Sequence, residues 1–166
     1  MAEYVRLFKE KGVTDVVRVC KPRYDAQVLQ QAGIRVHEFY FEDGGVPGAE
    51  LLSAWLHLVK ERISQSAEAG IRPIQPAVIA VHCVAGLGRA PLLVAIALME
   101  FGGLSALDAI ELIRSKRRGS LNSRQIRYLV DNYAVTASGN NVNRPASSTS
   151  QEGKGGFLRQ LIGKLF

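Results

Sequence analysis

Short apolar runs rich in β-branched residues alternate with longer helix-forming stretches along the first half of the chain. Residues 14–19, 34–40 and 76–82 have the composition of strands, and the last run is almost wholly apolar, as buried parallel strands are. Residues 24–32 and 49–66, which lie between the strands, are predicted to be helices. This alternation predicts an α/β fold with a central, mostly parallel sheet flanked by helices.

The segment between the third strand and the following helix contains the candidate chemistry. Residues 81–91 read VHCVAGLGRAP, and Pro91 fits the first turn of a helix that residues 92–98 continue. A sharp turn here points backbone N–H groups inward at the positive end of the helix dipole, where a phosphate dianion binds. Gly86 and Gly88 can take a positive φ without steric cost. The expected phosphate-binding residues are Val84, Ala85, Gly86, Leu87, Gly88 and Arg89.

Cys83 is the candidate nucleophile at the floor of this loop. Amide dipoles, a helix N-terminus and a guanidinium favour the thiolate, which is the reactive form of cysteine. Arg89 offers a planar fork that binds two phosphoryl oxygens, and it binds them more tightly as charge builds up in the transition state. A buried cysteine in an ordinary turn is the alternative for Cys83. For His82 the residues support both packing and tuning of the thiolate, and we assign it no chemical step.

Parallel strands end at a common edge of the sheet, where ligands bind in folds of this class. The three ends here are Cys20, residues 41–44 and Cys83. Asp43 is the candidate general acid, because a mobile loop flanked by glycine can deliver a carboxyl to a leaving group. Glu42 is its rival, and a solvated acidic turn is the alternative for both. Cys20 is either a disulfide partner for an oxidised Cys83 or a buried cysteine at a strand end.

Two further helices are predicted after the central motif. One begins at a cap over residues 105–108 and runs to about residue 116, and the other covers residues 122–133. The four cations of residues 114–122 suit a phosphorylated partner or lipid head groups, and they equally suit a solvated helix end. Gln125 fits two roles, the positioning of a hydrolytic water and the second member of a capping box opened by Asn122.

Composition narrows the class of protein. The 166 residues are enough for one core, and a net charge of +6 with a pI of about 9.6 favours phosphorylated or other acidic partners, including anionic membrane surfaces. Two cysteines are too few for a secreted disulfide scaffold or a four-cysteine zinc site, so no metal and no other cofactor is expected. The sequence has no bilayer-spanning run and no signal-peptide core, which predicts a cytoplasmic protein.

The chain divides into three parts by composition. Residues 1–135 form the expected catalytic domain, and residues 136–156 are rich in Ser, Asn and Gly, as flexible linkers are. Residues 157–166 predict a short amphipathic basic tail helix with its apolar residues on one face. This tail suits a peripheral anchor at the inner membrane face, and docking onto the catalytic domain is the equal alternative.

Four segments together resemble the phosphatase of regenerating liver family, which consists of small, cysteine-dependent, dual-specificity protein tyrosine phosphatases. They are residues 12–20, 41–44, 81–91 and 116–123, and the resemblance runs from about Lys9 to Tyr133. It implies the dual-specificity protein tyrosine phosphatase fold and hydrolysis of phosphomonoesters through a cysteinyl phosphate.

The resemblance carries roles over to matching positions. It implies Cys83 as the nucleophile, Arg89 as the phosphate ligand, Asp43 as the general acid and Cys20 as the disulfide partner. Most related phosphatases have Ser or Thr after the arginine, where this chain has Ala90, and an alanine cannot donate a hydrogen bond to the departing cysteine. The resemblance therefore predicts slow turnover with an accumulating phosphocysteine.

The family also suggests partners and alternatives. Phosphotyrosine proteins or phosphoinositides are the expected substrates, and no nucleic acid is expected. A regulatory binding module for cyclin M-type magnesium transporters, with vestigial catalysis, is the alternative function. Sulfur transfer or arsenate reduction is a more distant one, because those enzymes also place a cysteine in an anion-binding loop. This chain begins later than family members usually do and ends without their prenylated cysteine box, so no prenylation is expected.

Overall fold

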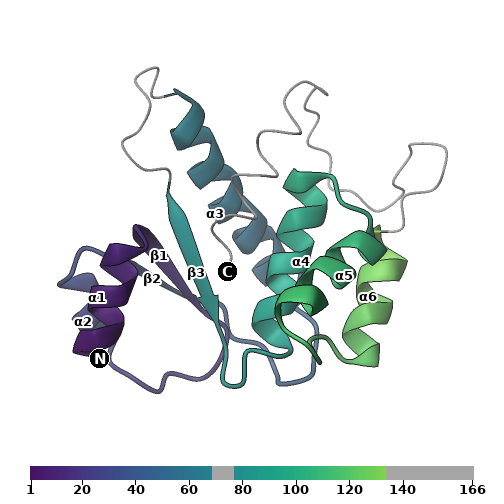
Figure 1. The fold of residues 1–166 in the computed structure, drawn as a ribbon, viewed down its shortest axis with the longest axis horizontal. Coiled ribbons are helices and arrows are strands. Elements are labelled where there is room, and N and C mark those ends of the chain that lie inside the picture. The colour runs from purple at the N-terminus through teal and green to yellow at the C-terminus, as the bar shows by residue number, and fades with distance from the viewer. Residues whose placement is uncertain (69–76, 134–166) are drawn as a thin grey trace. The chain divides into compact units, whose positions relative to one another are not determined.

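The computed structural model describes residues 1–68 and 77–133. The predicted linker and tail, residues 136–156 and 157–166, lie outside the described residues. The chain forms two compact units, which we call the sheet unit (Met1–Asp43 and Pro47–Val84) and the helical unit (Gly44–Val46 and Ala85 onward). In chain order (Figure 1) the elements are α1 Ala2–Glu10, β1 Val13–Arg18, α2 Gln27–Gln30, β2 Arg35–Glu38, α3 Ala49–Glu68, β3 Val78–His82, α4 Arg89–Gly102, α5 Ala106–Lys116 and α6 Ser123–Tyr133.

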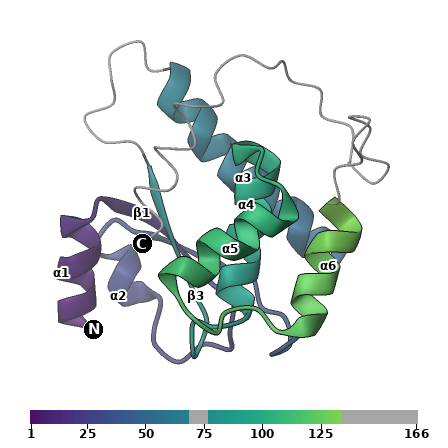
Figure 2. The same ribbon diagram turned by 45° about the vertical axis from the view of Figure 1, so that its right-hand side comes forward.

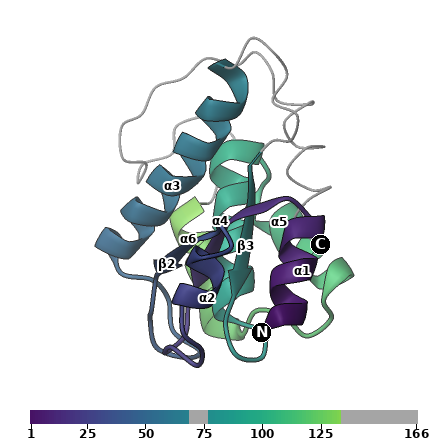
Figure 3. The same ribbon diagram turned by 90° about the vertical axis from the view of Figure 1, so that its left-hand side faces the viewer.

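The sheet unit confirms the predicted α/β class. Its strands follow the order β2-β1-β3, and both pairs are parallel. Figure 3 shows α1 and α3 on opposite sides of these strands. Helix α1 had no counterpart among the predicted elements. Helix α2 is shorter than the predicted helix over residues 24–32, because the Asp25 carboxylate accepts a hydrogen bond from Gln27 N (2.9 Å) and Gly33 turns the chain with a φ of +81°.

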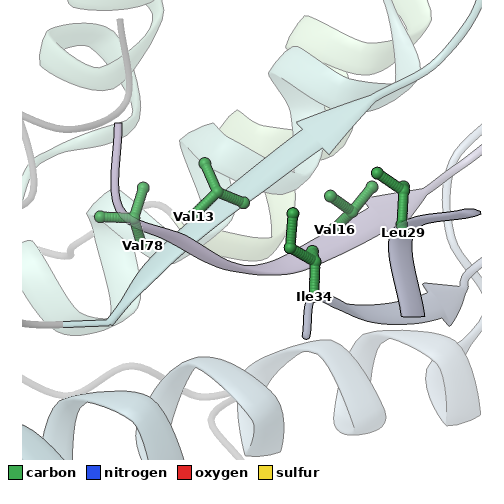
Figure 4. Close-up of a cluster of buried hydrophobic side chains, with 5 residues drawn as sticks. All are labelled: Val13, Val16, Leu29, Ile34 and Val78. Atoms are coloured by element: carbon green, nitrogen blue, oxygen red, sulfur yellow. The ribbon is translucent and has the colours of Figure 1, made fainter. Parts of the chain in front are cut away.

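An irregularity in β1 sets which side chains face which helix. The pairing with β3 shifts register between Val13 and Asp15. As a result Val13 and Val16 lie on one face although they are three residues apart, where a regular strand alternates every two. Both belong to a buried cluster with Leu29, Ile34 and Val78 (Figure 4). The partly buried residues Val5 and Phe8 of α1 pack against this cluster from outside the sheet.

On the other face of the sheet, Asp15 is fully buried and carries the densest set of ionic contacts in the described residues. Arg62 of α3 binds its two carboxylate oxygens at 2.9 and 3.0 Å. Arg35 and His37 of β2 bind it at 3.0 and 2.8 Å, and Thr14 donates to it at 2.7 Å. Burial acts to raise the pKa of Asp15, but the hydrogen bonds from Arg62, His37 and Thr14 overcome burial and hold it well below its usual range. The carboxylate therefore links β1, β2 and α3.

The helical unit is built around α4, whose residues are almost all buried. Helices α5 and α6 pack against it, as Figure 2 shows. Ser105 caps α5, and its Oγ accepts a hydrogen bond from Asp108 N at 3.2 Å, which confirms the predicted helix start. Within residues 1–68 and 77–133, no helix is both long and apolar enough to cross a membrane.

Asp15→Asn should destabilise the protein by about 3 kcal/mol at pH 7, because the buried Arg62 loses its buried counterion and keeps the partly exposed Glu61 at 3.0 Å. A depressed native pKa stabilises the fold fully above the unfolded pKa of about 4 and loses that contribution as pH falls below it. The stability difference between wild type and Asp15→Asn should therefore shrink by about 1.4 kcal/mol per pH unit below about pH 4. Urea unfolding at several pH values measures this difference.

Arg6→Gln is the matched control, since it breaks an exposed ion pair with Glu10 of 3.8 Å. It should change stability by less than about 0.5 kcal/mol at every pH. A stability difference for Asp15→Asn that stays constant down to pH 3 would contradict the role given to the carboxylate.

Candidate active site

Cys83 directly follows β3 in the sheet unit, and Cys20 lies two residues beyond the end of β1. The two strands are neighbours: Arg18 is the register partner of His82, and Val19 N donates to His82 O at 2.9 Å. Both thiols are free, and Cys20 is buried whereas Cys83 is partly exposed. The parallel register therefore brings both cysteines to the same edge of the sheet, as the order of the strands predicted.

His82 connects the cysteine backbone to a tyrosine that the sequence did not single out. Its Nε2 lies 2.7 Å from Tyr24 Oη, and its Nδ1 lies 3.2 Å from Cys83 O. Burial raises the pKa of Tyr24, so the phenol keeps its proton at neutral pH. These contacts join His82 to the backbone of the candidate nucleophile.

Arg18 contacts both the backbone and the ring of Tyr24. This arginine is 3% exposed, and its Nη1 donates to Tyr24 O at 2.7 Å while its guanidinium lies 4.5 Å from the centre of the Tyr24 ring. Its Nε donates to the Glu38 carboxylate at 2.9 Å. Sequence reasoning missed this network, although an arginine inside the apolar run of residues 13–19 was a signal that a buried partner existed.

The two acidic candidates follow β2 in the sheet unit, and both are exposed. Glu42 accepts a hydrogen bond from Tyr40 Oη at 2.6 Å. Asp43 directly precedes Gly44, which has a φ of +68° and so needs the conformational freedom of glycine.

The loop before α4 belongs to the helical unit from Ala85 onward. Gly86 has a φ of +67°, as the sequence predicted. Gly88 differs: it caps α4 with a φ of −122°, and it is small for another reason. A Cβ on Gly88 would lie 3.3 Å from Gln125 Nε2, so close packing requires the glycine here. Arg89 is the first residue of α4 and is buried, and Pro91 lies in the first turn as predicted.

Two carbonyls of this loop are bound from the connection between α5 and α6. Arg117 Nη2 donates to Ala85 O at 2.8 Å, and Leu121 N donates to Leu87 O at 2.7 Å. The C=O and N–H of one peptide unit point in opposite directions. The N–H groups of Gly86 and Gly88 therefore point away from this connection and, at the N-terminus of α4, can bind an anion.

The basic residues at the end of α5 and directly after it bind backbone carbonyls, a role that neither sequence interpretation included. Arg114 donates to Ser120 O at 2.9 Å and to Leu121 O at 3.1 Å, and Arg117 binds the loop as described. These cations satisfy backbone carbonyls of the connection and of the loop. Arg118 is exposed.

Gln125 is the capping residue and not a free amide. Its backbone N donates to Asn122 Oδ1 at 2.9 Å, and its Oε1 accepts from Asn122 N at 3.2 Å, which is a reciprocal capping box. Its Nε2 donates to Gly45 O at 3.0 Å. Each end of the buried amide therefore has one partner that fixes its orientation, and a second N–H and a second lone pair stay available.

The chain is similar to known phosphatases over most of its length. Residues 6–134 match a family model described as the dual specificity phosphatase catalytic domain. Protein tyrosine phosphatase PRL-1 of Leishmania major is 47% identical over 126 residues, which cover 76% of this chain and 71% of that protein. Protein tyrosine phosphatase type IVA 3 of Homo sapiens is 43% identical over 129 residues, which cover 78% and 69%.

Solved structures show the same likeness. The structure of a protein tyrosine phosphatase from Leishmania major has a TM-score of 0.71 and 45% identity to this chain, with 77% of each chain covered. Tk-PTP in its active form has a TM-score of 0.64 at 22% identity, with coverage of 78% and 82%. The second likeness concerns the fold alone.

Gly86→Ala should weaken anion binding by the loop, because the substitution strains a residue with positive φ and brings a Cβ to 3.4 Å from Arg117 Nε. The measurement is the phosphate concentration that protects Cys83 from alkylation by iodoacetamide, which should rise. Gly33→Ala is the control, since Gly33 also has a positive φ but no atom within 4 Å of the added Cβ. Both variants should lose roughly 1–2 kcal/mol of stability, but Gly33→Ala should leave protection unchanged. Equal protection in all three proteins would sink the assignment.

Proposed function

Because this chain belongs to the dual specificity phosphatase family, and within it to the phosphatases of regenerating liver, or type IVA protein tyrosine phosphatases, we propose that Cys83 carries its phosphate-transfer chemistry. The chain is a protein tyrosine phosphatase. The site is supported by the hydrogen bonds that the Ala85 and Leu87 carbonyls accept from Arg117 and Leu121. These bonds leave the N–H groups of the same peptides free to face an anion at the N-terminus of α4.

The reaction has two half-reactions in this proposal. The Cys83 thiolate attacks phosphorus, an S–P bond forms, and the bond from phosphorus to the phenolic oxygen breaks. Asp43 donates its proton to the departing oxygen, and Arg89 with the loop amides stabilises charge on the other phosphoryl oxygens. Water then attacks phosphorus, gives a proton to Asp43, and displaces Cys83 as a thiolate, which releases inorganic phosphate. We assign the acid to Asp43, the position to which the family resemblance carries this role, and it directly precedes Gly44 with its positive φ.

The second half-reaction has less help from the protein than the first. Ala90 is the second residue of α4 and carries no hydroxyl that could donate to the departing Cys83 sulfur. Gln125 is fully buried and its amide is oriented by Asn122 and Gly45, so it is not free to turn toward a water. Both features favour accumulation of the phosphocysteine.

An aryl phosphate should therefore give a burst of phenol release equal to one equivalent of protein, followed by slow turnover, with a phosphate adduct visible in the intact mass. Ala90→Ser should speed the slow phase by roughly tenfold, the worth of one hydrogen bond to a charged group, without changing the burst. Cys83→Ser should abolish the burst and the adduct. Release that survives in Cys83→Ser would disprove the nucleophile, and an unchanged slow phase in Ala90→Ser would disprove the role of the hydroxyl.

We also propose that Cys20 protects the nucleophile against irreversible oxidation. Peroxide oxidises the Cys83 thiolate to a sulfenic acid, and attack by the Cys20 thiolate forms a disulfide and releases water. The parallel register that brings both residues to one edge of the sheet supports this step. The magnesium-transporter, phosphoinositide and membrane-surface partners stay predictions from the sequence.

Wild type treated with a small excess of hydrogen peroxide should recover its activity on addition of dithiothreitol. Cys20→Ser should start with equal activity and recover much less, because without a disulfide Cys83 proceeds to sulfinic acid, which thiols do not reduce. Peptide mass spectrometry of the oxidised wild type should find Cys20 joined to Cys83. Full recovery of Cys20→Ser would contradict the proposal.

A further inference from the structure

The carbonyls directly after Asp43 are bound by the N-terminus of α6. Gly44, Gly45 and the whole of α6 belong to the helical unit. Asn122 Nδ2 donates to Gly44 O at 3.0 Å, and Gln125 Nε2 donates to Gly45 O at 3.0 Å. The sequence predicted a mobile loop at this glycine pair. Both carbonyls instead have fixed donors from a helix that lies about 80 residues away in the chain.

Asn122 does more than a helix cap requires. Capping uses only an acceptor, and Asn122 Oδ1 supplies it to Gln125 N at 2.9 Å. Ser, Thr and Asp cap helices equally well, but none of them offers a second, N–H donor from the same short side chain. The Nδ2 donor of Asn122 is the group that reaches Gly44. The approach is close, since a Cβ on Gly44 would lie 3.4 Å from Nδ2.

The same connection is bound to the phosphate loop. Leu121, next to Asn122, is the non-glycine residue with a positive φ in the described ranges, at 66°, and its N donates to Leu87 O at 2.7 Å. Arg114 holds this strained conformation through the carbonyls of Ser120 and Leu121. Strain that the surroundings maintain in this way is typical of functional segments. Gln125 packs against Gly88 as well as binding Gly45.

We propose that Asn122 is a positioning residue for the first half-reaction: its amide fixes the peptide of Gly44 and so sets the direction of the neighbouring Asp43 carboxyl. This inference rests on the proposed function, in which Asp43 is the general acid. Asn122 and Gln125 then hold Gly44 and Gly45, and the adjacent Leu121 holds the phosphate loop.

The test separates the cap from the contact with Gly44. Asn122→Ser keeps an acceptor for the cap but loses the donor to Gly44, so the fold should hold. With phenyl phosphate, whose leaving group needs a proton, the single-turnover rate of Asn122→Ser should fall. The fall should be a large part of the roughly 10²–10⁴-fold that a general acid supplies. The rate with 2,4-dinitrophenyl phosphate, whose leaving group needs little protonation, should stay within about twofold.

Three further variants complete the experiment. Asp43→Asn should show the same selectivity between the two substrates, and Asp43→Asn/Asn122→Ser should show no further loss, because both changes remove the same proton transfer. Ser123→Ala, an exposed neighbour, should behave as wild type. Thermal unfolding of each variant confirms that the fold is retained.

These outcomes test the role of Asn122 separately from the proposed phosphatase function. If Asn122→Ser slows both substrates equally, or slows neither, Asn122 is a helix cap only and the inference fails. If losses in the double variant multiply, Asn122 acts independently of Asp43 and the inference also fails. In both cases, loss of the burst in Cys83→Ser still supports the proposed phosphatase function. A burst that persists in Cys83→Ser contradicts the proposed function itself.

Discussion

The parallel pairing of β1 with both of its neighbours is the constraint on which the sheet unit depends. One register aligns Arg18 with Glu38 on one side and with His82 on the other. The same register aligns the end of β1 with the end of β3, so Cys20 and Cys83 lie just beyond neighbouring strand ends. The irregularity near the start of β1 completes the arrangement, since it turns Val16 toward the apolar cluster and Asp15 toward α3.

In the helical unit, hydrogen bonds to backbone carbonyls fix the conformation of the loop. A glycine-rich loop has too little side chain to be held by packing, and a free loop would lose conformational entropy on binding phosphate. Here the carbonyls of Ala85 and Leu87 have fixed donors, as do those of Gly44 and Gly45. All four donors come from residues 117–125. The loop is therefore organised before a ligand arrives, which is the condition for electrostatic stabilisation of a transition state.

The sequence predicted what depends on local spacing and missed what depends on distant contacts. The α/β class, the order of strands, the loop before α4 and the cap at Ser105 could be predicted because neighbours in the chain determine them. The Tyr24–His82 contact joins residues 58 apart, and the Asn122–Gly44 contact joins residues 78 apart. No periodicity reports such pairs. For Gln125 the capping box was visible in the sequence, but its contact with Gly45, 80 residues away, was not.

The contacts of the two proposed half-reactions are unequal, and this inequality bears on what the protein does. The groups proposed to serve attack on phosphorus have defined neighbours: His82 contacts the Cys83 carbonyl, the loop carbonyls have fixed donors, and the Gly44–Gly45 peptide is bound by Asn122. The groups that would serve hydrolysis of the phosphocysteine are missing at Ala90 or already bound at Gln125. Preorganisation lowers only the barrier in which the organised groups take part. In the proposed mechanism, this distribution of contacts favours acquisition of phosphate by Cys83 over its release to water.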